Sequence, residues 1–222
     1  MIQRSALSIV LVVILVFAAR TVGQTQSFAG ASDTATITAA ERAAGPSFDA
    51  SVSVADRAWI LAAVAKARPE AQRLIGEIDG LTTFRTSSGL DSGVGVTHSR
   101  MSGGTARFEI DLDVATLNGQ RVVDRDVVVL HELGHAVDFA LVPTELNARL
   151  EAAIPRTGLC ERDAQGAFGA CTEPAERFAD TFAKWALRGG VSAVGAGYGV
   201  ATPPSLEDWG GPLALLAGEQ PR

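Results

Sequence analysis

The chain has 222 residues, of which 47% are hydrophobic and 20% charged, and its formal net charge at pH 7 is −6. This length and composition predict one globular domain with enough apolar residues for a core. The acidic excess, with no block of five or more like charges, argues against a nucleic acid or an anionic membrane surface as partner.

Residues 1–23 have the pattern of an export signal: a short basic start, an almost entirely apolar run over residues 6–19, and small residues after it. A run this short fits a signal peptide better than a membrane-spanning helix, which needs about 20 apolar residues. We therefore predict a secreted protein, cleaved after Gly23 or, as a second choice, after Ala31. Because Arg20 follows the run directly, an uncleaved signal that anchors the chain in the membrane is the alternative.

Residues 24–53 are rich in Ser, Thr, Ala and Gly and have no sustained period, which predicts a flexible linker or a short pro-segment. The folded domain is predicted over residues 54–222. It begins with two amphipathic helical segments, 55–67 and 70–78, the second ended by Gly80.

Three strands are predicted next, at residues 81–86, 94–98 and 107–114. In the third, apolar and charged residues alternate strictly, so that one face is buried and the other is wet. Because this strand comes just before the helix that follows, we expect it to be an edge strand that forms the upper edge of a cleft. Its free backbone groups would then pair with an extended peptide; an ordinary amphipathic strand is the alternative.

Residues 127–137 form an apolar run that carries His-Glu-x-x-His at its centre. On a helix, His131 and His135 stand on one face, one turn apart, and can bind one Zn²⁺. Glu132 lies beside them and can act as general base toward a water on the metal. The alternative is a buried helix whose histidines are satisfied by protein partners.

Pro143 ends this run, and a short helix is predicted over residues 144–153. Cys160 and Cys171 follow and are the two cysteines of the chain. In an exported protein they predict a disulfide bond, which would stabilise the fold by about 3 kcal/mol. Metal ligation by this pair fits less well, because the spacing does not match a zinc knuckle.

A further helix is predicted to start at Pro174, with Thr172 or Glu173 as its cap, and to end at Gly189-Gly190, with Glu176 and Asp180 on one face. Two carboxylates on a helix that packs into the core need partners. A zinc ion would provide one for Glu176, and Asp180 would accept the free ring N–H of a zinc-bound histidine. Two solvated carboxylates on an exposed face are the alternative.

The pattern His-Glu-Leu-Gly-His at residues 131–135, with Glu-x-Phe-Ala-Asp at residues 176–180, resembles the gluzincin group of the zincin metallopeptidases. Thermolysin-like and lethal-factor-like peptidases have the same arrangement, His-Glu-x-x-His followed by Glu-x-x-x-Asp or Glu. The resemblance covers roughly residues 105–187. It implies an α+β fold in which an active-site helix and a glutamate-bearing helix lie below a small mixed sheet. The third ligand lies farther along this chain than in thermolysin, and no further histidine occurs in residues 136–144, as metzincins would require.

The resemblance also implies a role for each motif residue. His131, His135 and Glu176 would bind one zinc ion, Glu132 would be the base and proton shuttle, and Asp180 would orient a ligand. Asp138, three residues after His135, has either a similar supporting role or the role of a salt-bridged carboxylate at the helix end. Other candidates for the third ligand are Glu161, Asp163 and Glu173. Candidate donors to an oxyanion are Tyr198, His98 and Arg177, although Tyr198 also fits a surface loop and His98 a strand or turn.

Taken together, these features predict a secreted zinc endopeptidase whose partner is a peptide or protein substrate. A zincin-like binding protein, in which zinc only holds the fold, is one alternative. Glu132 argues against it, because a structural site needs no base beside an open position. A toxin-like peptidase with one dedicated target is the other alternative.

Overall fold

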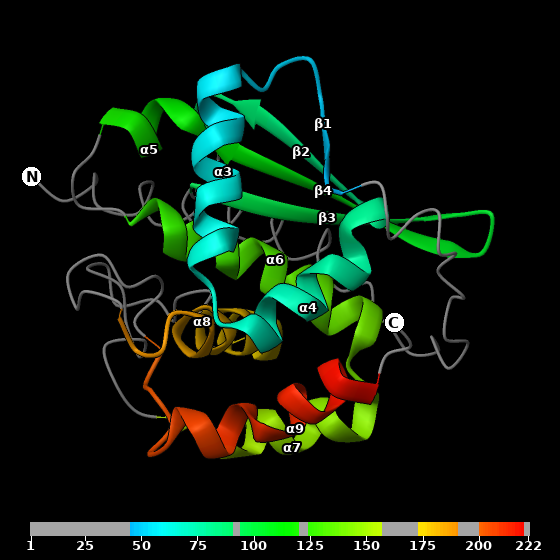
Figure 1. The fold of residues 1–222 in the computed structure, drawn as a ribbon, viewed down its shortest axis with the longest axis vertical. Helices are drawn as coiled ribbons and strands as arrows, with labels where there is room; N and C mark the ends of the chain where they lie inside the picture. Colours follow the sequence, from blue (N-terminus) through cyan, green and yellow to red (C-terminus); the bar gives the residue numbers. More distant parts are fainter. Residues whose placement is uncertain (1–44, 91–93, 120–123, 157–172, 191–199, 220–222) are drawn as a thin grey trace, which may run out of the picture. The chain divides into compact units, whose positions relative to one another are not determined.

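The computed structural model describes residues 45–90, 94–119, 124–156, 173–190 and 200–219. In this part of the chain the fold is α+β, with a mixed sheet packed against several helices (Figure 1). The strands are β1 (Ser47–Phe48), β2 (Thr82–Ser87), β3 (Gly95–Ser102) and β4 (Thr105–Asp113). The helices are α3 (Val54–Lys66), α4 (Pro69–Ile78), α5 (Val114–Gly119), α6 (Arg125–Leu141), α7 (Thr144–Ala153), α8 (Pro174–Ala186) and α9 (Leu206–Glu219), with a 3₁₀ turn, η1 (Asp79–Leu81), before β2.

The four described strands lie in the order β1-β2-β4-β3. β1, β2 and β4 are parallel, whereas β3 runs antiparallel to β4. The prediction that residues 107–114 form the edge strand is therefore wrong: β4 lies inside the sheet, and β3 is the edge strand that contacts α6. The alternation in β4 indicates that one face is buried and the other is in contact with water, but it does not indicate whether strands pair with β4 on one side or on both.

The sheet extends into the segment that the sequence assigns to a linker. Ser47 and Phe48 pair in register with Thr83 and Phe84, and the two phenylalanine rings stack with centroids 5.6 Å apart. Val52 lies in the core. A strand of two residues has no measurable period, which is why the pattern did not indicate it.

α6 lies between the sheet and α8 (Figure 1) and contacts β3, β4, α3, α4 and α8. This central position explains why its residues 127–138 are all buried. Below it, aromatic rings of α8 and α9 pack together, with centroids 5.6 to 6.5 Å apart: Phe178, Phe182, Trp185 and Trp209. None of the helices in the described ranges is long and apolar enough to cross a membrane.

Candidate metal centre

α6 holds the two histidines of the motif in the interior. The helix begins where the carboxylate of Asp124 accepts a hydrogen bond from the backbone N–H of Asp126, 3.0 Å away. From there its apolar residues bury it on nearly all sides. His131 is 3% and His135 is 7% exposed, and their rings lie edge to face with centroids 4.9 Å apart.

α8 brings the third candidate ligand because it packs very closely on α6. A Cβ added at Gly134, between the two histidines, would lie 3.1 Å from the Cα of Ala179 and 3.3 Å from its carbonyl oxygen. The glycine therefore removes the side chain that would hold the helices apart. Glu176, one turn before Ala179, then faces the histidine side of α6.

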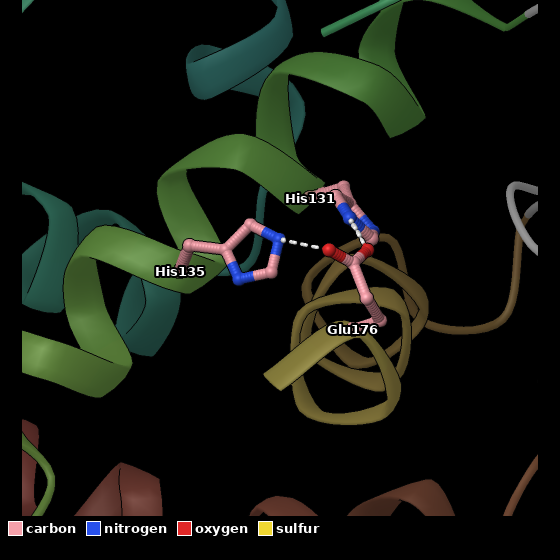
Figure 2. Close-up of side chains that lie close together, drawn as sticks. All are labelled: His131, His135 and Glu176. Carbon is pink, nitrogen blue, oxygen red and sulfur yellow. Dashed lines mark hydrogen bonds and ion pairs between the residues drawn. The ribbon is translucent and has the colours of Figure 1, made fainter. Parts of the chain in front are cut away.

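The carboxylate of Glu176 lies between the two rings and meets one with each oxygen (Figure 2). Oε2 is 3.1 Å from Nε2 of His131, and Oε1 is 3.5 Å from Nε2 of His135. One ligand atom from each of the three residues lies within 4.8 Å of the others. In a tetrahedral zinc site with bonds of about 2.0–2.1 Å, neighbouring donors lie about 3.3 Å apart. The two distances to Glu176 are close to this value, so the group could hold a metal ion.

The electrostatics of the site also favour a cation. Burial raises the pKa of Glu176, but its hydrogen bonds with His131 and His135 outweigh burial and lower it to about 2. Burial lowers the pKa of His135, yet the neighbouring carboxylates of Glu176, Glu132 and Asp138 raise it above its ordinary value. Three carboxylates thus act on one buried imidazole, and a bound cation would neutralise this excess of negative charge.

Glu132 is 2% exposed and lies outside the group of three candidate ligands. Its Oε2 accepts a hydrogen bond of 2.7 Å from the hydroxyl of Thr97 on β3. A Cβ added at Gly95 of the same strand would lie 2.6 Å from its Oε1. The carboxylate is therefore held against the edge strand, and it acts electrostatically on His135.

Asp180 and Asp138 have defined neighbours. Asp180 is fully buried, and Nζ of Lys184 forms an ion pair with its Oδ2 at 2.6 Å. Asp138 accepts a hydrogen bond of 2.6 Å from the Asn147 side-chain amide, and burial raises the pKa of Asp138 to about 6. That Asp180 orients a zinc-bound histidine stays a prediction.

Three other candidates lie away from this centre. His98 is half-exposed on β3, with Nε2 3.7 Å from Oδ2 of Asp111. Glu173 is exposed at the start of α8. Arg177 is buried, and its guanidinium donates hydrogen bonds to the Glu151 carboxylate and to the carbonyl of Ile154; that it is an oxyanion donor stays a prediction. Five further predicted residues lie outside the described ranges: Cys160, Glu161, Asp163, Cys171 and Tyr198.

Sequence reasoning did not find four residues around the site. Gly95 and Thr97 lie in a strand of no clear period, and nothing in the pattern links them to Glu132. Phe139 follows His135 by one helical turn, and its ring stacks on the imidazole with centroids 6.3 Å apart. Lys184 follows Asp180 by the same interval, a spacing from which the ion pair is predictable.

Searches against family models, curated proteins and solved structures gave no match to this chain.

Proposed function

We propose that the protein is a zinc-dependent peptidase. The observation that carries the proposal is the convergence of His131, His135 and Glu176 next to a buried carboxylate, Glu132, that is not one of the three. Three protein ligands leave one position of a four-coordinate zinc ion open, which is the arrangement of catalytic sites. The signal-like residues 1–23 support an exported location as part of the same proposal.

A zinc ion held by the three residues supplies Lewis acidity, which acidifies water and polarises a peptide carbonyl. Glu132 accepts the proton of the attacking water and passes it to the leaving amine. Thr97 and Gly95 limit the positions that its carboxylate can take. Glu176 keeps its negative charge at neutral pH and remains about a quarter exposed, so the ligand group borders solvent.

A peptide is the substrate that best fits the surroundings. β3 is the edge strand of the described sheet and contacts α6. An extended peptide can add to such an edge through main-chain hydrogen bonds, which hold its carbonyl groups in a fixed register. The edge role that the sequence analysis assigns to residues 107–114 therefore passes to residues 95–102 in this proposal.

The test uses the full chain loaded with zinc and a diverse peptide library, with products identified by mass spectrometry. Glu132→Gln keeps an acceptor for the Thr97 hydroxyl, so we expect it to retain fold and zinc and to lose at least about 100-fold in turnover. Glu176→Ala removes a ligand, and we expect at least about 100-fold weaker zinc binding. Glu173→Ala is the matched control: this exposed residue directly precedes the same helix and its side chain makes no capping hydrogen bond, so the change should affect neither quantity.

The outcomes separate the proposal from its alternatives. Cleavage that is lost in Glu132→Gln and on chelation supports a peptidase with this base. Full activity in Glu132→Gln would remove Glu132 from the mechanism. One bound zinc with no cleavage of any peptide would contradict a general peptidase and would favour a binding protein or an enzyme with one dedicated target.

A further inference from the structure

Two residues of the edge strand face the carboxylate of Glu132. In the antiparallel register Gly95 pairs with Leu112 and Thr97 pairs with Ile110. Paired residues point to the same face of a sheet, and both partners on β4 are fully buried. Gly95 and Thr97 therefore lie on the core face of β3, which is the face that contacts α6.

Each residue acts on one oxygen of the carboxylate. Oγ1 of Thr97 is 2.7 Å from Oε2 of Glu132 and 3.0 Å from the main-chain carbonyl oxygen of the same residue. On the other side, a Cβ at Gly95 would come within 2.6 Å of Oε1, which real Cβ atoms essentially never do. The strand thus provides a hydrogen-bond donor for one oxygen and space for the other.

We propose that Thr97 is a positioning residue for Glu132 and that Gly95 provides the space which its carboxylate occupies. The hydroxyl has one proton, so it donates to the carboxylate or to the carbonyl, not to both at once. When the carboxylate turns toward a substrate, the hydroxyl transfers its hydrogen bond to the carbonyl. The part-buried hydroxyl is then not left without an acceptor.

The importance of this contact for catalysis rests on the proposed function, but the contact itself does not. Thr97→Val removes the hydroxyl and keeps the branched shape, whereas Thr97→Ser keeps the hydroxyl. Gly95→Ala places a methyl group against Oε1, the oxygen of the same carboxylate that Thr97 does not contact. The atoms that a new Cβ would meet belong to the outer part of the flexible Glu132 side chain, so we expect this side chain to move while β3 keeps its register.

The first experiment is a double-mutant cycle in the metal-free full chain, read by urea unfolding. It compares Thr97→Val in the wild-type and Glu132→Ala backgrounds, which both retain the carbonyl of residue 132. We expect Thr97→Val to raise the unfolding equilibrium constant about tenfold more in the wild-type background than in Glu132→Ala, and Thr97→Ser to stay near wild type. An equal effect in both backgrounds would overturn the proposal.

The second experiment measures steady-state turnover of the zinc-loaded chain. Thr97 and Gly95 act on the Glu132 carboxylate and not on the substrate. We therefore expect Thr97→Val and Gly95→Ala to lower kcat about tenfold and to leave zinc content and KM unchanged. Thr97→Ser keeps the hydroxyl and should retain most of the wild-type kcat. An unchanged kcat in both variants would overturn the positioning role. If the wild-type chain cleaves no peptide, the proposed function fails, while the metal-free cycle still decides whether Thr97 holds the carboxylate.

Discussion

Two buried side chains of opposite charge form an ion pair along α8. Asp180 is fully buried, and its counter-ion Lys184 is 7% exposed. The ammonium also donates a hydrogen bond to the carbonyl of Val200, which ties α8 to the chain just before α9. An ion pair of this kind contributes little net stability when intact, but removing one partner is costly because a buried charge stays behind.

Lys184→Met tests how much it costs to leave the buried Asp180 carboxylate without its counter-ion. Methionine keeps the length and apolar volume of the lysine stem but removes the charge, so we predict a loss of about 3–5 kcal/mol in the free energy of unfolding. Urea unfolding at pH 7 measures it. Adding Asp180→Asn removes the remaining charge and should recover much of the loss; a double variant as unstable as Lys184→Met would show that charge is not the cause.

At the scale of elements, the candidate metal centre depends on how closely α6 and α8 approach each other. Gly134 makes this approach possible, because any side chain there would press on the backbone of Ala179 and the ring of Phe182. The three candidate ligands come from both helices, so a shift of a few tenths of an ångström between the helices would change the distances from Glu176 to the histidines by a similar amount. Packing and metal affinity are therefore coupled.

In Gly134→Ala the new methyl group would overpack against α8, at a cost of about 1–3 kcal/mol. We expect α8 to move outward to relieve this cost, and the longer distance from Glu176 to the histidines should lower zinc affinity at least about tenfold. Competition with a chromophoric chelator measures the affinity. Gly76→Ala in α4 is the matched control: nothing lies within 4 Å of its added Cβ, so it should stabilise the helix by about 0.5–1 kcal/mol and leave zinc affinity unchanged. Equal affinities in both variants would contradict the coupling.

The elements differ in how far the sequence determines them. The helices at 54–66, 69–78 and 174–186 follow the predicted segments closely, because their period and their end signals act locally. The grouping of His131 and His135 with Glu176 was also predictable, since only a few residue types at fixed spacing bind zinc. Edge position, by contrast, depends on contacts between strands far apart in sequence, and so does the contact of Thr97 with Glu132.

At the scale of the whole described fold, the candidate centre uses elements from three parts of the chain. β3 touches the proposed base, α6 carries that residue and two candidate ligands, and α8 carries the third candidate ligand. Besides contacting one another through α6, these elements have further partners: β3 pairs with β4, α6 packs on α3 and α4, and α8 packs on α7 and α9. Because the centre needs all three, global stability sets the fraction of the protein in which the candidate centre is assembled at any pH.

Asp79, distant in sequence from the metal centre, is predicted to make that stability depend on pH. Burial raises its pKa from 3.8 to about 6. The folded state therefore binds the Asp79 proton more tightly than the unfolded state does. The contribution of Asp79 to the free energy of unfolding is greatest below pH 3.8 and is lost as pH rises through 6. Above that range the half-buried carboxylate is charged and imposes a cost.

Asp79→Asn removes this cost. The rise of the Asp79 pKa from 3.8 to about 6 corresponds to about 3 kcal/mol, which we reduce to about 1 kcal/mol because the carboxylate is only half-buried. We therefore expect Asp79→Asn to raise the free energy of unfolding of the metal-free chain by about 1 kcal/mol at pH 7 and to leave it unchanged near pH 3.5. Urea titrations of both proteins at the two pH values measure the difference. A gain of the same size at both would mean that Asn improves packing or hydrogen bonding at this turn, and that the Asp79 charge has no part in the effect.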